Sequence, residues 1–384
     1  MYGYAFLDDF VLLYPVYALL FSDTGLSVQQ ISSLFALWSL TGVVLEVPSG
    51  AWADAVSRRL LLWLGPLLTA VGFALWVLVP SYWAFALGFV LWGTRGALVS
   101  GALEALVYEE LDRLGAADRY AHVMGRAHAA GLVAVMAATG LAGPVFAWGG
   151  YPAIGAASVL VCLASAATAT RFPEHRGPAG EGGESWAATL RAGLVEVRRE
   201  RSVRGAILLV PAVTAVWGAL DEYTPLLVRD TGVAEAAVPY LLLVIWAGAT
   251  AGSLPAGRCE RLGRPGLAWL LGGAAAALAV GAMGRTPVAL GLVALAFGGF
   301  QLTTVLADAR LQRRLDDSGR ATVTSVAGLG TDLATVAVYE GYGAIATRAG
   351  HAVTFAVFAV PYLLIALLLA VPRNESPSDR RRAQ

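Results

Sequence analysis

Long apolar stretches alternate with short polar connections along the whole chain. Most of these stretches reach the roughly 20 residues that one membrane-crossing helix requires. Twelve can be distinguished, at about 3–22, 28–53, 60–80, 82–107, 122–147, 151–171, 205–228, 236–257, 266–284, 287–308, 321–347 and 351–372. The pattern predicts an all-α membrane protein with twelve transmembrane helices.

Composition agrees with this pattern and excludes several classes of protein. Of the 384 residues, 57% are apolar and only 14% are charged, whereas soluble domains carry roughly 25% charged residues. The formal net charge is zero, which argues against a nucleic-acid partner. All 27 basic residues are arginine, so neither a Walker-type ATPase nor lysine-based catalysis is expected. The two cysteines and four histidines show no metal-ligand spacing, and we expect no cofactor and no enzymatic activity.

The arginines are distributed unevenly between the connections. When the connections are numbered alternately from the N-terminus, one side holds 23 arginines and the other side holds three. Arginine accumulates on the cytoplasmic side of membrane proteins. We therefore expect a multi-pass protein of the plasma (inner) membrane with both termini in the cytoplasm.

The chain repeats itself. Asp23-Thr24-Gly25 returns as Asp230-Thr231-Gly232, 207 residues later. Parallel repeats of this kind build the two halves of many transporters. The predicted organisation is a six-helix half (1–172), a cytoplasmic linker (173–204), a second six-helix half (205–373) and a cytoplasmic tail (374–384). The linker contains an amphipathic pattern that would form a helix either at the membrane surface or packed under the bundle.

The loop after the second stretch carries a recognisable motif. Four of its residues follow the pattern G-x-x-x-D-R-x-G-R-R, namely Gly50, Asp54, Arg58 and Arg59. Ala55 and Ser57 depart from it. Together with the span number, the long central loop and the repeat, the motif resembles the signature of the major facilitator superfamily. The resemblance implies two pseudo-symmetric halves and a cytoplasmic latch formed by this loop, with Arg126 as a possible partner. The alternative is that Arg58 and Arg59 only determine topology.

Two more motifs resemble those of the same superfamily. Arg95 lies inside the fourth stretch, where the resemblance implies a role in proton transfer; a structural ion pair is the alternative. Glu104 follows nine residues later, out of helical phase with Arg95, so the two should not pair directly. In the fifth stretch Gly140, Gly143 and Pro144 resemble the glycine–proline motif of antiporters, with altered spacing. They predict a bend in this helix and favour export over uptake.

Acidic residues inside apolar stretches are costly and mark proton or cation pathways. Five acidic residues and one arginine of the apolar stretches are the candidates for proton coupling: Asp8, Asp9, Arg95, Glu104, Asp221 and Glu222. Adjacent residues of a helix point about 100° apart, so we expect only one member of each acidic pair to face a cavity. Asp221 lies nearer the middle of the membrane than Asp8. Solvated charges at the inner membrane surface are the alternative for Asp8 and Asp9.

The resemblance also implies which helices line the substrate cavity. The substrate-binding candidates are Tyr14, Tyr17, Trp217, Asp221, Tyr223, Gln301, Asp332 and Tyr339, the last two sharing one helical face. Aromatic side chains together with an acid suit a lipophilic or cationic solute. Packing and interface positions are the alternative for the tryptophans and tyrosines.

These features predict a monomeric secondary transporter in the lipid bilayer, driven by the proton gradient. Its expected activity is proton-coupled export of a small amphiphilic or drug-like molecule. The alternatives are uptake by proton or sodium symport, and a non-transporting receptor or assembly factor with a transporter fold. Neither the substrate nor the direction of transport follows from the sequence, because one fold supports many functions.

Overall fold

The computed structural model describes residues 1–55, 57–173, 201–312 and 320–371. Side chains are described for all of these except 46–55, 201–208, 312 and 320–326. Every regular element in the described part of the chain is a helix, as the apolar pattern predicts. The predicted linker helix lies outside the described residues.

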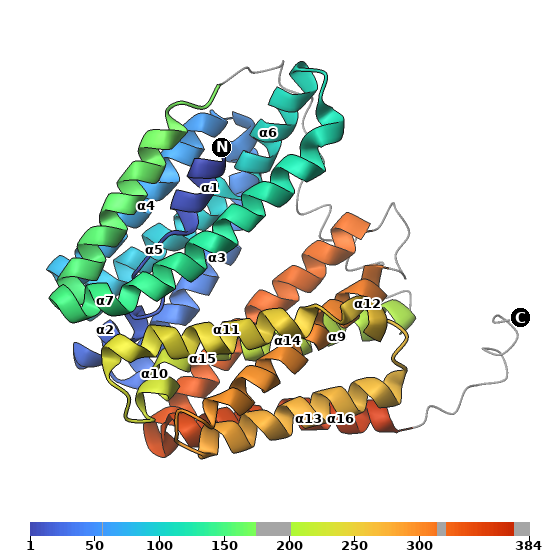
Figure 1. The fold of residues 1–384 in the computed structure, drawn as a ribbon. Helices are drawn as coiled ribbons and strands as arrows, with labels where there is room; N and C mark the ends of the chain where they lie inside the picture. Colours follow the sequence, from blue (N-terminus) through green and yellow to red (C-terminus); the bar gives the residue numbers. More distant parts are fainter. Residues whose placement is uncertain (56, 174–200, 313–319, 372–384) are drawn as a thin grey trace, which may run out of the picture.

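Two groups of helices follow one another along the chain (Figure 1). The N-terminal half comprises α1 (Tyr2–Asp9), α2 (Tyr17–Asp23), α3 (Val28–Ala55), α4 (Arg58–Leu78), α5 (Tyr82–Val99), α6 (Ala102–Arg113), η1 (Ala117–Arg119) and α7 (Tyr120–Ala169). The C-terminal half comprises α9 (Arg201–Asp221), α10 (Thr224–Arg229), η2 (Glu235–Ala237), α11 (Val238–Ser253), α12 (Ala256–Cys259), α13 (Arg264–Met283), α14 (Leu290–Gln312), α15 (Arg320–Phe358) and α16 (Val360–Ala370).

Two of the long helices each contain a sharp reversal. The backbone leaves the helical region at Gly149 and Gly150 inside α7, and at Gly350 inside α15. Gly150 and Gly350 have positive φ values of 60° and 76°, which glycine adopts without the steric cost that a side chain adds. Each reversal separates two predicted apolar stretches. The path of the described helices is therefore consistent with twelve crossings.

The first crossing of each half is interrupted. In the N-terminal half, residues 10–16 separate α1 from α2, and Pro15 lies within this break. In the C-terminal half, the chain leaves α9 at Asp221 and starts α10 at Thr224, with Pro225 in the first turn. Proline disfavours helical geometry at the residue before it but fits the start of a new helix. Both acidic pairs consequently lie where a crossing helix ends.

The two halves approach each other at one end of the molecule and diverge toward the other (Figure 1). We call the first the closed end; it contains α2, α10 and the C-terminal part of α7's first segment. We call the second the arginine-rich end; it contains α6, α12 and the N-terminus. The outer surface exposes large apolar side chains, for example Trp148 (86% exposed) and Trp269 (83% exposed). Such exposure is what a lipid-facing surface requires.

Candidate functional site

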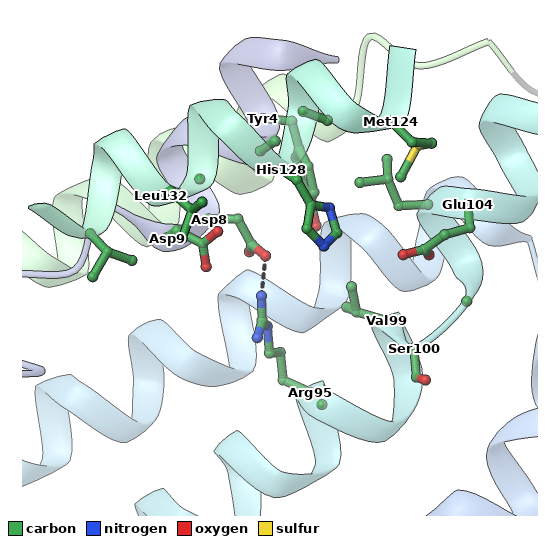
Figure 2. Close-up of a pocket in the computed structure, with 17 residues that line it drawn as sticks. Tyr4, Asp8, Asp9, Arg95, Val99, Ser100, Glu104, Met124, His128 and Leu132 are labelled. Carbon is green, nitrogen blue, oxygen red and sulfur yellow. Dashed lines mark hydrogen bonds and ion pairs between the residues drawn. The ribbon is translucent and has the colours of Figure 1, made fainter. Parts of the chain in front are cut away.

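A cavity of about 600 Å³ lies inside the N-terminal half, toward the arginine-rich end. We call it the acidic cavity. Helices α1, α5, α6 and α7 surround it, and its titratable lining residues point into one space (Figure 2). These residues are Tyr4, Asp8, Asp9, Arg95, Glu104 and His128. Four of the six predicted proton-coupling residues therefore come together here.

Arg95 of α5 forms an ion pair with Asp8 of α1 (Figure 2). The two side chains are only 19% and 18% exposed. Glu104 lines the same cavity from α6, beyond a break at Gly101, whose φ is 71°. A charge-assisted hydrogen bond between a guanidinium and a carboxylate is strong where water is scarce. This contact fixes α1 against α5 and leaves Asp9 and Glu104 as the other carboxylates of the acidic cavity.

The expectation that one member of each acidic pair faces away was wrong. Asp8 and Asp9 both line the acidic cavity. Asp221 and Glu222 likewise both line a second cavity, described below. The 100° separation holds for residues inside a regular helix, but Asp9 is the last residue of α1 and Glu222 follows the last residue of α9. The helix breaks allow neighbouring residues to reach the same space.

His128 is a lining residue that the sequence reasoning missed. It shares one face of α7 with Gly131 and Val135, at spacings of three and seven residues, and all three line the acidic cavity. A Cβ atom added at Gly131 would collide with the carboxylate of Asp9. A polar residue in register with glycines in an apolar stretch was the available signal. It was overlooked because the histidines were considered only as metal ligands.

A second cavity, of about 440 Å³, lies between the two halves. We call it the central cavity. The N-terminal half contributes Tyr14, Tyr17, Trp38, Trp92, Arg95 and Val135, and the C-terminal half contributes Asp221, Glu222, Pro225, Leu242 and Trp246. Arg95 also lines the acidic cavity, so its ion pair with Asp8 lies at the junction of the two spaces.

Only part of the predicted substrate site lines the central cavity. Tyr14, Tyr17 and Asp221 do so. The described lining does not include Trp217, Tyr223, Gln301, Asp332 or Tyr339. Tyr223 is instead fully buried and shares a hydrogen bond of 2.7 Å with Ser32 of the other half. Tyr339 is 3% exposed and packs against Phe35 and Tyr223, so both tyrosines belong to the contact between the halves.

Three tryptophans of the central cavity were missed by the sequence reasoning. Trp92 precedes Arg95 by three residues and therefore lies on the same face of α5. Trp38 stacks on Trp92, with 5.0 Å between the ring centroids. The indole N–H of Trp246 donates a 2.9 Å hydrogen bond to the carboxylate of Asp221. Helical phase with Arg95 could have identified Trp92, but the partners of Trp38 and Trp246 depend on the packing of separate helices.

The residues of the predicted latch make other contacts in this structure. Arg58 forms an ion pair with Glu109 of α6. The guanidinium of Arg126 lies 5.4 Å from the centre of the Tyr2 ring. Gly50 and Asp54 lie in α3, and their side chains are outside those that the structure describes, so the latch stays a prediction. A guanidinium nitrogen (Nη1) of Arg59 lies 3.5 Å from the carbonyl oxygen of Phe172, which is the upper limit for a hydrogen bond.

The predicted bend in α7 is not marked by a break in its dihedral angles. The chain stays helical through Gly140, Gly143 and Pro144, and leaves the helical region only at Gly149 and Gly150. Gly143 has a different structural role: it is buried against Ala236 and Tyr240 of the C-terminal half. The bend itself stays a prediction.

The closed end is held by a polar network across the two halves. Arg229 of α10 donates hydrogen bonds to Asp23 and Ser22 of the N-terminal half, each of 2.7 Å. Tyr151 donates a 2.5 Å hydrogen bond to the second carboxylate oxygen of Asp23. Nearer the centre of the molecule, Gln29 donates a 2.9 Å hydrogen bond to Glu340 of α15. These contacts close this end in the described conformation.

Replacing Arg229 with alanine is expected to destabilise the closed end. The ion pair with Asp23 is 26% and 33% exposed on its two sides, so its loss should cost about 1 kcal/mol, or about a fivefold change in population. Spin labels at the exposed positions Ser27 and Ala234 would report this as a larger share of long distances. Arg348→Ala removes another exposed arginine of this end and should leave the distances unchanged. An unchanged distribution in Arg229→Ala would exclude a closing role.

Comparison with known proteins identifies the family. The model of the Major Facilitator Superfamily matches residues 2–339. The chain belongs to this superfamily. It is accordingly a multi-pass membrane protein with a transporter fold, as the motif in the loop after the second stretch implied. No curated protein sequence matches the chain at a significant level.

Solved structures of this superfamily share the fold over nearly the whole chain. A crystal structure of a point mutant of the nucleoside transporter NupG superposes with a TM-score of 0.79 at 11% identity, covering 96% of this chain and 97% of the other. A second structure of NupG gives 0.74 at 13% identity, covering 96% of each chain. A bacterial homolog of the human lysosomal transporter Spinster, inward-facing and unoccupied, gives 0.67 at 16% identity, covering 97% and 96%. At these identities the likeness shows the fold alone.

Proposed function

We propose that this protein is a non-enzymatic secondary active transporter, which couples the movement of a small amphiphilic solute to protons by alternating access. The observation that carries the proposal is the position of Arg95 between two cavities. One cavity is shared by both halves and suits a solute, while the other collects the carboxylates Asp8, Asp9 and Glu104. A solute in the central cavity could thus influence the protonation of the acidic cavity through the Arg95–Asp8 pair.

We place the arginine-rich end and both termini in the cytoplasm, in a plasma membrane. The support is the distribution of arginine, 23 on one side and three on the other. In this orientation the closed end with Asp23 and Arg229 faces outward, and the described conformation is inward-facing. No cofactor other than the proton gradient is required, and a monomer contains both cavities.

For the direction of transport we propose export by antiport. The Gly140, Gly143 and Pro144 pattern supports it, because it resembles the antiporter motif. Uptake by symport is the second candidate, because the fold itself fixes neither the direction of transport nor the coupling. Inverting the proton gradient across proteoliposomes would separate them. An antiporter accumulates the solute inside the vesicles when the proton gradient is directed outward, whereas a symporter does so when it is directed inward.

Replacing Asp221 with asparagine is expected to reduce solute-driven proton movement at least about tenfold. We propose Asp221 as a further proton carrier, in the central cavity. Asparagine keeps an oxygen that accepts the hydrogen bond from Trp246, so the local geometry is retained while the titratable carboxyl is lost. The measurement uses proteoliposomes with an internal pH-sensitive dye and a panel of candidate solutes.

Asp118→Asn, at an exposed position of η1, is the matched control and should behave like the wild type. Undiminished proton movement in Asp221→Asn would remove this residue from the mechanism. A protein that binds solutes but moves neither solute nor protons under any gradient would instead support a non-transporting receptor on the same fold.

A further inference from the structure

Aromatic rings form one wall of the central cavity. The ring of Trp92 lies nearly parallel to two other rings, with 5.2 Å and 15° between it and Tyr14 and 5.0 Å and 24° between it and Trp38. The three side chains come from the first, second and fourth crossings of the N-terminal half. Flat ring faces carry negative electrostatic potential and attract cations as well as other rings.

Two carboxylates of the C-terminal half line the same cavity. Asp221 is oriented by Trp246, whose indole N–H donates to it. Glu222 lines the same cavity, and among the described residues its side chain has no hydrogen-bond or ion-pair partner. An unpaired carboxylate at this depth is costly unless a proton or another cation neutralises it. Glu222 is therefore the open position of the site.

The charge of the cavity is not balanced by the protein. Arg95 is the single basic residue among the described residues that line the cavity, and its charge is already neutralised by the ion pair with Asp8. Apart from Arg95, the described lining holds no basic residue that could pair with Asp221 or Glu222. The central cavity consequently offers two carboxyl groups and a set of stacked aromatic rings to whatever occupies it.

We propose that the central cavity binds a flat organic cation, namely a protonated or quaternary aromatic amine, and that Glu222 selects for its positive charge. The ring of the ligand lies against the wall of Tyr14, Trp38 and Trp92, and its cationic nitrogen faces Glu222. The carboxylate of Asp221, held by its hydrogen bond from Trp246, is directed toward the same nitrogen. A proton and the cation then compete for one carboxylate. The binding site stands by itself, while the consequence that the ligand is exchanged for protons rests on the proposed transport function.

The test compares bicyclic probes of one shape and different charge. N-methylquinolinium is a permanent cation, quinoline N-oxide is its neutral counterpart, and 1-naphthoate is an anion. Binding to the purified full-length protein in lipid nanodiscs is measured by calorimetry, without any gradient. We expect the cation to bind at least about tenfold more tightly than the N-oxide, and the anion not to bind detectably. Equal affinities for cation and N-oxide in the wild type would overturn the proposal without any variant.

Variants then assign the selection to Glu222. Glu222→Gln should lower the preference for the cation at least about threefold, with Asp221 accounting for the remainder, whereas Glu222→Asp should keep the wild-type preference. Glu260→Gln, an exposed carboxylate of the same half, is the matched control and should behave like the wild type. A full cation preference in Glu222→Gln would show that Glu222 is not the selecting group. Because the readout is binding alone, a failure of proton coupling in proteoliposomes leaves this result unaffected, and the reverse also holds.

Discussion

Asp8→Asn and Arg95→Gln, each made alone, are expected to abolish solute-driven proton movement and to destabilise the protein. Either change leaves one charge of the pair without a partner inside the bundle. Removing one member of a buried ion pair costs about 3–5 kcal/mol. The two side chains keep 18% and 19% exposure, so we expect a loss of about 2–4 kcal/mol here. Thermal unfolding of the purified protein and dye-reported proton movement in proteoliposomes measure the two effects.

The double variant Asp8→Asn/Arg95→Gln separates stability from coupling. Because it removes both charges, it should regain most of the lost stability, yet proton movement should stay absent. Arg113→Gln is the matched control, since it removes an exposed arginine whose ion pair with Glu110 joins neighbouring turns of α6. Wild-type proton movement in either single variant would show that the pair has only a structural role.

Gly143→Val is expected to prevent the closed end from forming. An added Cβ at this position would lie 2.5 Å from the carbonyl oxygen of Ala236 and 2.8 Å from the ring of Tyr240. Both belong to the other half, so the two halves would have to separate. Overpacking of this kind costs about 1–3 kcal/mol, and 2 kcal/mol would change the conformational population about thirtyfold. Transport should fall correspondingly, because alternating access requires closure at each end in turn.

Gly140→Val provides the matched control for this prediction. Gly140 lies on the same helix, one turn earlier, and an added Cβ would have no neighbour within 4 Å. Both variants place the same β-branched residue into α7, so an effect on helix propensity or bending would appear in both. Distance measurements between labels at the closed end should change in Gly143→Val alone. Equal effects of the two variants would favour a helix-bending role over a role in closure.

The sequence located the chemistry of the site better than its geometry. Asp8, Asp9, Arg95 and Glu104 were recognised because charged residues in apolar stretches are rare and costly. The sequence did not predict that they share one cavity, because Asp8 in α1 and Arg95 in α5 are 87 residues apart in the chain. The expectation that only one member of each acidic pair faces a cavity was wrong, because helical phase fails where a helix ends. Pro15 and Pro225 are the local sequence signals of these helix breaks.

The substrate site shows the same limit in another form. Tyr14, Tyr17 and Asp221 were identified, but the wall that Trp38 and Trp92 build with Tyr14 joins three helices that are distant in the chain. An aromatic residue in an apolar stretch has the same local signature whether it faces lipid, core or cavity. Tyr223 and Tyr339 illustrate the ambiguity, since they form the contact between the halves instead of lining the cavity.

By itself, the sequence determined an all-helical membrane protein, because apolar stretch length directly reflects the thickness of the bilayer. It also determined the family, through a motif of the loop after the second stretch, and the set of buried charges. Only the tertiary structure decided that Arg95 pairs with Asp8, that Glu222 lines one cavity together with Trp38 and Trp92, and that Arg229 bonds to Asp23 across one end. Pairing between side chains depends on the relative rotation and depth of packed helices, and neither quantity is encoded in any one stretch of the chain.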